Sequence, residues 1–190
     1  MSKELDQLDL KILFELQLNG RISITDLAKK IGASRPTTSS RLKRLIEEGY
    51  ALVRSGLNLN RVGYKMACVG LEVRNDSSRR EVERCLKDCP RVLHIFRTSE
   101  KANIHIAIWG EEDQTMNSTI ESFRDLPDVE IVYTHYLGAP MYGDVVFPVT
   151  TEKVEKTPCG KDCASCYRYD QGWCIGCPIT FDYKDPIATK

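Results

Sequence analysis

The sequence lacks both a net charge and any long apolar run. Its 27 lysine and arginine residues balance 27 aspartate and glutamate residues, so the chain as a whole has no bulk attraction to nucleic acid or to a membrane surface. No apolar stretch approaches the roughly 20 residues that a transmembrane helix needs, and residues 1–6 lack the apolar core of a signal peptide. We therefore expect a cytoplasmic protein without a membrane partner. In a reducing compartment its cysteines would be thiols or metal ligands rather than disulfides.

Three segments near the start of the chain have the apolar spacing of amphipathic helices. They cover residues 5–19, 24–31 and 35–48, and residues 32–34 supply a tight turn between the second and the third. In this pattern Asp9 lies on the polar face of the first helix. Two short helices joined by a tight turn are typical of a helix-turn-helix, whose second helix enters the major groove of DNA.

A local excess of positive charge accompanies this turn. Residues 21–54 contain eight basic and three acidic residues, although the whole chain is neutral. A helical wheel places Ile46 inward and the polar and basic residues of the third helix outward. The first residues of this helix could reach base edges, and its arginines could hold phosphates or guanine edges. The predicted DNA-binding residues are Arg35, Thr37, Ser40, Arg41, Lys43 and Arg44. The alternative is a solvated face on an ordinary three-helix domain.

The middle of the chain alternates between strand and helix patterns. The order is strand, helix, strand, strand, helix, strand, and the segments are 66–73, 78–87, 92–98, 103–109, 115–124 and 129–137. This order is that of a ferredoxin-like βαββαβ domain, in which both helices cover one face of the sheet. The other face needs a cover, and a second subunit is the obvious one.

Several short motifs, taken in order, resemble the Lrp/AsnC family of prokaryotic transcription regulators. They are Leu5-Asp6-x-Leu8-Asp9-x-x-Ile12-Leu13, Asp26-Leu27-Ala28-x-x-Ile31-Gly32-x-Ser34 and Arg41-Leu42-x-x-Leu45-x-x-x-Gly49-Tyr50. Residues 53–64 resemble the extended hinge of that family, and the resemblance covers about residues 3–140. It implies that the chain is not an enzyme, that it binds double-stranded promoter or operator DNA, and that effector domains pair into homodimers, which often assemble further.

The predicted fold class is therefore α+β, with three domains joined by two short connections. They are an N-terminal three-helix domain of the helix-turn-helix or winged type (1–55), a hinge strand (56–65), a ferredoxin-like effector and dimerisation domain (66–148), a linker (149–158) and a small cysteine-rich module of metal-binding type (159–190).

One turn departs from the family pattern. In this family the turn between the second and third strands of the effector domain usually carries a Gly and an Asp, and small effectors such as amino acids bind near it. Here residues 98–103 contain no glycine, so we do not expect an ordinary amino-acid pocket. Glu100, Lys101 and Asn103 could bind a polar effector, although charges at a hairpin tip are more often simple turn residues.

Five of the eight cysteines crowd into the end of the chain. These tail cysteines are Cys159, Cys163, Cys166, Cys174 and Cys177. The Cys-x-x-Cys pairs at 163–166 and 174–177 can each place two sulfurs on one ion, and the seven residues between them allow a hairpin that brings the pairs together. With the effector turn altered, the tail becomes the candidate sensor.

Several metals suit the tail cysteines. Cys163, Cys166, Cys174 and Cys177 would close a tetrahedral zinc site and leave Cys159 spare, and this interpretation is favoured. The alternatives are an iron–sulfur cluster on Cys159, Cys163, Cys166 and Cys177, a copper-type site, and pairwise thiol oxidation without a permanent metal. Zinc could also merely staple a tail too short to fold alone. In the sensing interpretation, loss of ligands or oxidation would free the tail and change the affinity for DNA.

The other cysteines and the histidines carry weaker signals. Cys85 and Cys89, one helical turn apart among apolar residues, and Cys68 are expected to be buried and unreactive. Three histidines, His94, His105 and His135, would share one sheet and could bind a metal or a heme-like ligand. They support a rival interpretation, because siroheme decarboxylases resemble Lrp-type regulators in architecture and use strand histidines for a tetrapyrrole. The basic helix and the lack of a paired acid–base motif argue against an enzyme.

Overall fold

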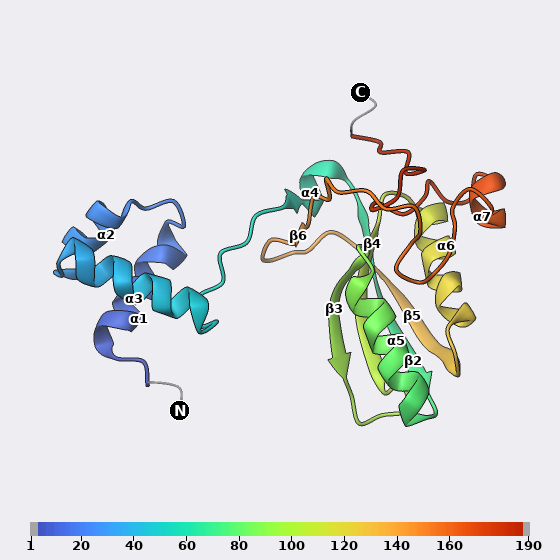
Figure 1. Ribbon diagram of the computed structural model, residues 1–190, viewed down its shortest axis with the longest axis horizontal. Helices are drawn as coiled ribbons and strands as arrows, with labels where there is room; N and C mark the ends of the chain where they lie inside the picture. Colours follow the sequence, from blue (N-terminus) through green and yellow to red (C-terminus); the bar gives the residue numbers. More distant parts are fainter. Residues whose placement is uncertain (1–3, 188–190) are drawn as a thin grey trace. The chain divides into compact units, whose positions relative to one another are not determined.

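The computed structural model describes residues 4–187 and divides the chain between Ser55 and Gly56 into two compact units (Figure 1). Each unit has its own hydrophobic core. No helix within residues 4–187 is long and apolar enough to cross a membrane.

The first unit is built from three helices. They are α1 (Gln7–Leu18), α2 (Ile24–Ile31) and α3 (Arg35–Glu47), which confirms the three predicted helices. The fully or nearly fully buried residues of their shared core are Ile12, Leu27, Ile31, Leu45 and Ala51. Residues 4–55 contain no strand, so this part of the chain has a helix-turn-helix without a β wing.

The turn between α2 and α3 follows directly from its residues. Gly32 ends α2 in a left-handed conformation with φ of 69°, which glycine adopts without the steric penalty of a Cβ atom. Ser34 then caps α3, because its hydroxyl accepts a hydrogen bond from the backbone N–H of Thr37 at 3.2 Å. Pro36 sits in the first turn of α3, where no intrahelical hydrogen bond is lost.

The second unit contains a four-stranded antiparallel sheet with the predicted βαββαβ connectivity. Its elements are β2 (Lys65–Val73), α5 (Asp76–Asp88), β3 (Val92–Arg97), β4 (Ile104–Gly110), α6 (Asp113–Ser122) with one 3-10 turn (Phe123–Asp125), and β5 (Val129–Leu137). The strand order is β3-β4-β2-β5, which is the ferredoxin-like order that the sequence predicts.

Alternate residues of the two central strands face the helices. On β2 and β4 these are the odd-numbered apolar residues from Ala67 to Val73 and the even-numbered isoleucines from Ile104 to Ile108. Val82 and Leu86 of α5 pack against them, together with apolar residues of α6. Both helices therefore cover the same face of the sheet (Figure 1).

The opposite face of the sheet carries rings and histidines. His94, His105 and His135 all lie on it, and Phe96 and Tyr133 stand between them, with neighbouring ring centroids 4.9 to 6.3 Å apart. Tyr133 lies over β2 at Gly70, where a Cβ atom would come within 2.3 Å of the tyrosine ring. Glycine is thus needed at this position for the ring to cross the strand.

Residues 56–65, predicted as a hinge strand, contain more regular structure than expected. Leu57–Asn58 forms β1, which pairs with β6 (Val146–Phe147), and Leu59–Val62 forms the short helix α4. An aromatic stack of Tyr64, Trp109 and Phe147 packs beside them. The segment therefore packs into the second unit.

Candidate functional site

The DNA-facing candidates of α3 fall into two groups. Arg35, Thr37, Ser40 and Lys43 are exposed to solvent, as expected for residues that reach DNA. The Thr37 hydroxyl lies 2.8 Å from that of Ser34, and the Lys43 ammonium lies 3.7 Å from Glu47. Both of these contacts are at the surface, where they contribute little to stability.

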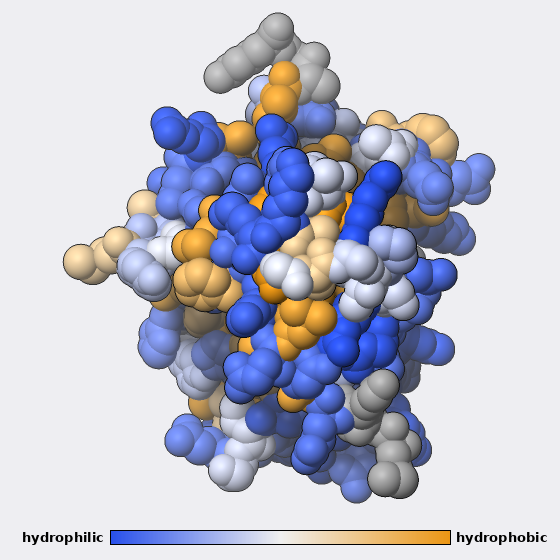
Figure 2. All heavy atoms as spheres, turned by 90° about the vertical axis from the view of Figure 1, so that its left-hand side faces the viewer, coloured by the Kyte–Doolittle hydropathy of each residue, from blue (hydrophilic) through white to orange (hydrophobic). Residues whose placement is uncertain are grey.

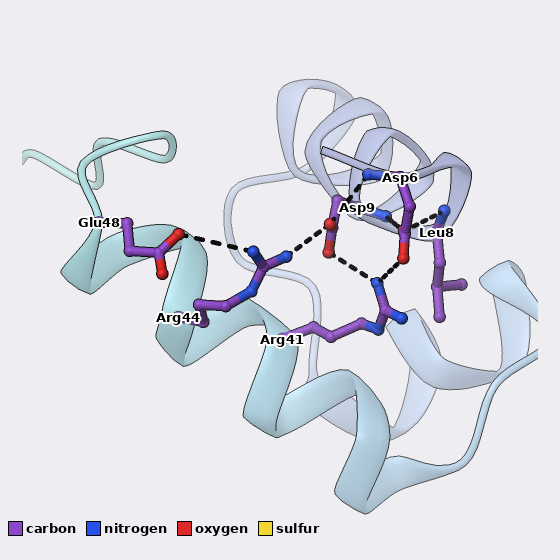
Figure 3. Close-up of polar contacts among 6 residues, drawn as sticks. All are labelled: Asp6, Leu8, Asp9, Arg41, Arg44 and Glu48. Atoms are coloured by element: carbon purple, nitrogen blue, oxygen red, sulfur yellow. Dashed lines mark hydrogen bonds and ion pairs between the residues drawn. The ribbon is translucent and has the colours of Figure 1, made fainter. Parts of the chain in front are cut away.

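Arg41 and Arg44 instead turn toward α1 (Figure 3). Arg41 donates to Asp6 at 2.5 Å and to Asp9 at 3.0 Å, and Arg44 donates to Asp9 at 2.5 Å. Arg44 also lies 3.5 Å from Glu48. Both arginines are only partly exposed and join α3 to α1. The helical wheel instead assigns Arg44 to the outward face and Arg41 to its flank.

Asp9 is the centre of this group. Its side chain is 1% exposed, which corrects the expectation that it lies on the polar face of α1. A carboxylate at this depth is stable as an ion only because charged donors surround it. Ile46, by contrast, was expected inward and is 43% exposed.

The arginines shift the pKa values of both aspartates. Hydrogen bonding from Arg41 lowers the pKa of Asp6 to about 2. Burial alone would raise the pKa of Asp9, but hydrogen bonds from Arg44, from the Asp6 backbone and from Arg41 outweigh it and hold that pKa below its usual range. Both carboxylates are therefore charged at neutral pH, and each forms an ion pair with at least one arginine.

Hydrophobic side chains interrupt a mostly hydrophilic surface on the side drawn in Figure 2, where they gather near the middle of the view. The exposed apolar residues of α1 are Leu10, Phe14 and Leu18, at four-residue spacing. This spacing places them on one side of the helix.

The end of the chain docks on the helical side of the second unit. Figure 1 draws it in orange to red beside α6, and two hydrogen bonds fix it there: Ser118 donates to the Trp173 carbonyl at 2.6 Å, and the Ile175 N–H donates to Thr115 at 3.3 Å. Lys161 and Arg168 pair with Asp125 just beyond α6. The segment is thus part of the second unit.

A buried ion pair strengthens this docking. Arg91 and Glu111 form a salt bridge in which the side chains are 4% and 2% exposed. Each also holds the tail: Arg91 donates to the Gly176 carbonyl at 2.7 Å, and Glu111 accepts from the Tyr183 hydroxyl at 2.6 Å. Burial raises the pKa of Tyr183, so it remains a donor at neutral pH. These contacts require no metal ion.

The tail cysteines, from Cys159 to Cys177, line a single cavity of about 90 Å³ between the tail and the helices. The structure therefore brings both Cys-x-x-Cys pairs and Cys159 together. Two further cysteines line the same cavity, Cys85 of α5 and Cys89, which follows the last residue of that helix. They were expected to be inert core residues. Their four-residue spacing, which puts both on one face of a helix, was the available signal.

The thiols of the cavity have different acidities. The pKa of Cys159 is lowered to about 5, mainly through its hydrogen bond with Cys85, whose own pKa is raised by the same contact. Burial raises the pKa of Cys177 to about 12. Thr157 contributes to the lowering at Cys159, with its hydroxyl 3.1 Å from the sulfur.

The donor set suits a soft metal, because thiolates prefer zinc, copper(I) and iron–sulfur clusters. Three cationic side chains line the cavity, Arg91, Lys161 and Arg168, and the lining contains no carboxylate. These charges favour anionic sulfur, but burial outweighs them at Cys174 and Cys177 and raises the pKa of both thiols. Among residues 4–187, however, no three His, Cys, Asp or Glu side chains already lie in a coordinating arrangement. Coordination would require the sulfurs to draw inward.

The weaker candidates have other partners. Asn103 bonds the Val73 backbone twice, at 2.9 and 3.0 Å, and Lys101 pairs with Glu130 at 3.3 Å. Glu100 is exposed at the hairpin tip. The rings of Tyr167 and Trp173 in the tail contact each other with centroids 5.3 Å apart, and these residues are 62% and 46% exposed.

Comparisons with known proteins agree with this architecture. A family model described as winged helix-turn-helix DNA-binding matches residues 5–51. The proline dehydrogenase transcriptional activator of Rhizobium radiobacter is 46% identical over 61 residues, which are 32% of this chain and 39% of that protein. The leucine-responsive regulatory protein of Rhizobium meliloti (strain 1021) is 31% identical over 138 residues, which are 69% of this chain and 82% of that protein.

Solved structures show the same fold. The leucine response regulatory protein LrpA of Mycobacterium tuberculosis superposes with a TM-score of 0.66 at 20% identity, covering 73% of this chain and 96% of that one. The two Rhizobium relatives are named as a transcriptional activator and a regulatory protein, which argues against the decarboxylase interpretation. The match to the Rhizobium meliloti protein, at 31% identity over most of that protein's length, establishes that the chain belongs to the Lrp/AsnC family of DNA-binding transcriptional regulators.

Proposed function

We propose that the protein is a sequence-specific regulator whose α3 reads double-stranded operator DNA and whose tail cysteines bind a soft metal ion. Metal binding or thiol oxidation in the tail changes the affinity for DNA. The protein acts as a homodimer that can assemble further. Zinc is the favoured ion, and an iron–sulfur cluster is the second candidate.

The exposed residues at the start of α3 carry the DNA part of the proposal. Arg35 and Ser40 are solvent-exposed on a helix that a tight turn joins to α2, and a recognition helix contacts bases through such N-terminal residues. The partial exposure and α1 pairing of Arg41 and Arg44 favour a supporting role, in which they fix the angle of α3 against α1.

Substitution of Arg35 tests this part. The purified full chain is first used to select the DNA fragments that it binds from the source genome, and a selected fragment then serves as the operator. The Arg35→Ala variant should then bind it with roughly 5- to 150-fold lower affinity, since a specific arginine–guanine contact is worth about 1–3 kcal/mol. Arg80→Ala removes the same charge from an exposed site on α5 in the other unit. Equal binding by wild type and both variants would contradict the assignment of α3.

The tail part rests on the gathering of the tail cysteines around one cavity. Purified wild-type protein should contain bound metal by elemental analysis, and the double variant Cys163→Ser/Cys174→Ser should contain much less. Cys68→Ser is the matched control, because this cysteine lies on β2 away from the cavity. Absence of metal from the wild type would refute a resident ion.

A purely structural metal is the second candidate function for the tail. It is favoured over sensing because the Arg91–Glu111 pair anchors the tail near Gly176 and Tyr183 independently of any ion, so loss of the ion leaves this part of the tail docked. In that case chelation lowers stability and leaves operator affinity unchanged.

The uncovered sheet face supports the dimer. It presents Phe96, which is 54% exposed, beside the histidines and Tyr133. A second copy with the same face would cover it through a two-fold contact and present two recognition helices to a two-fold operator. Sedimentation of the full chain should show at least a dimer, and a monomer would contradict this part.

A further inference from the structure

The C-terminal end of α5 contributes two cysteines to the cavity that the tail cysteines line. Cys85 lies in the last turn of the helix, Cys89 is the residue that caps it, and both line the cavity. Cys85 and Cys159, which line the same cavity, are more than 70 positions apart in the sequence. Seven of the eight cysteines of the chain therefore surround one space of about 90 Å³.

We propose that Cys85 and Cys89 are metal ligands, and that the seven cysteines form one shared site for two thiophilic ions of the zinc type. This inference rests on the proposed metal binding of the tail and extends it to the effector domain. One ion would be held chiefly by the two Cys-x-x-Cys pairs of the tail, and the second by Cys85, Cys89 and Cys159 with one sulfur shared between the ions.

The number of sulfurs favours two ions over one. A single tetrahedral ion uses four thiolates and would leave three of the seven without a role. Two tetrahedral ions that share one bridging sulfur use all seven. The cavity volume of about 90 Å³ is several times the roughly 10–15 Å³ that a single water molecule needs, so there is room for more than one ion even before the sulfurs draw inward.

The charges around the cavity suit such a centre. Two zinc ions with seven thiolates carry a net negative charge, and Arg91, Lys161 and Arg168 line the cavity without a carboxylate among the lining residues. These cations are also paired outside the lining, Arg91 with Glu111 and the other two with Asp125. They therefore remain charged and in place when the thiols ionise.

A shared centre gives the tail a direct connection to α5. Occupancy would tie residues 159–177 to a helix that packs through Val82 and Leu86 on the sheet. Loss of the second ion would release α5 from the tail, while the Arg91–Glu111 pair still holds the tail to the domain. The response to metal then begins at the contact between α5 and the tail.

Metal stoichiometry tests the proposal directly. Full-length wild type loaded with zinc and freed of excess should contain two zinc ions per chain, the Cys85→Ser/Cys89→Ser variant one, and Cys68→Ser two. A wild type with one ion, or an α5 variant that keeps two, would overturn the shared site. An iron- and sulfide-containing wild type would overturn the assignment to two zinc-type ions.

The outcomes also separate this inference from the function on which it rests. If the wild type holds no ion, the proposed metal binding of the tail fails as well. If the wild type holds one ion, and Cys163→Ser/Cys174→Ser loses it while Cys85→Ser/Cys89→Ser keeps it, then the tail binds metal and only the shared site is wrong.

Alkylation of the wild type avoids any folding defect of the variants. Iodoacetamide labelling followed by peptide mapping should find Cys85 and Cys89 protected together with the tail cysteines in the zinc-loaded protein. All seven should become reactive after chelation, whereas labelling of Cys68 should not change. Equal labelling rates of Cys85 and Cys89 with and without zinc would overturn the proposal.

Discussion

The substitution Asp9→Asn tests how the recognition helix is held. The Asp9 carboxylate is 1% exposed and accepts hydrogen bonds from Arg41 at 3.0 Å, from Arg44 at 2.5 Å and from the Asp6 N–H at 3.2 Å. An asparagine keeps one acceptor oxygen but loses the charge that both arginines face. The arginines are 30% and 22% exposed, so water compensates part of the loss.

We expect Asp9→Asn to destabilise the first unit by about 2–3 kcal/mol, which is below the range of about 3–5 kcal/mol for breaking a fully buried pair. Under conditions in which exchange reports the opening equilibrium, this destabilisation corresponds to roughly 30- to 150-fold faster hydrogen exchange. The two tryptophans, Trp109 and Trp173, lie in the second unit, so their fluorescence would miss the effect.

Hydrogen exchange followed by mass spectrometry of peptides from α1 and α3 is therefore the suitable assay. The control Glu47→Gln removes a carboxylate that is 63% exposed and 3.7 Å from Lys43, and it should change stability by less than about 0.5 kcal/mol. Protection in Asp9→Asn equal to that in Glu47→Gln would refute the idea that Asp9 organises the helices.

Three further outcomes are expected. First, the pKa of Asp6 is depressed from 3.8 to about 2, so its ion pair with Arg41 stabilises the first unit fully above about pH 4 and is lost as the pH falls toward 2. Hydrogen-exchange protection of α1 measured between pH 5 and 2 should show this loss, and a flat profile would contradict the pairing. Second, Glu111→Gln leaves Arg91 buried without its counter-charge and should lower the free energy of unfolding by roughly 3–5 kcal/mol. Urea unfolding followed by tryptophan fluorescence measures this, and Glu121→Gln, at an exposed site, should have little effect. Equal urea midpoints for the two variants would argue against the buried pair. Third, Arg35→Ala should lose more affinity for the operator than for unrelated DNA, since a base contact carries specificity and a phosphate contact does not. Equal losses of affinity for both DNAs would make Arg35 a phosphate ligand.

Much of the fold was predictable because its signals are local. The spacing of apolar residues, the cap Ser34 and the turn at Gly32 fixed the helices of the first unit. The order of strand and helix patterns was sufficient for the βαββαβ topology. Such signals depend on neighbours in the sequence, so they can be recognised without a structure.

The tertiary contacts could not be predicted in the same way. Periodicity assigned Asp9 to the solvent because aspartate is usually exposed, yet two arginines of α3, more than 30 positions away, make its burial possible. Cys85 and Cys89 were assigned to the core because their partners, the tail cysteines, lie in another part of the chain. Docking of the tail by Arg91 and Glu111 likewise depends on residues with no shared motif.

Operator binding before and after metal removal is the most direct test of the account. Fluorescence anisotropy of one labelled operator duplex is titrated with metal-loaded full chain, and then with the same preparation after chelation, with the bound metal measured in both. The account predicts that operator affinity differs at least about tenfold, which is a coupling free energy of about 1.4 kcal/mol between tail and DNA. Superimposable curves, with the loss of the ion verified, would contradict a sensing role for the tail cysteines.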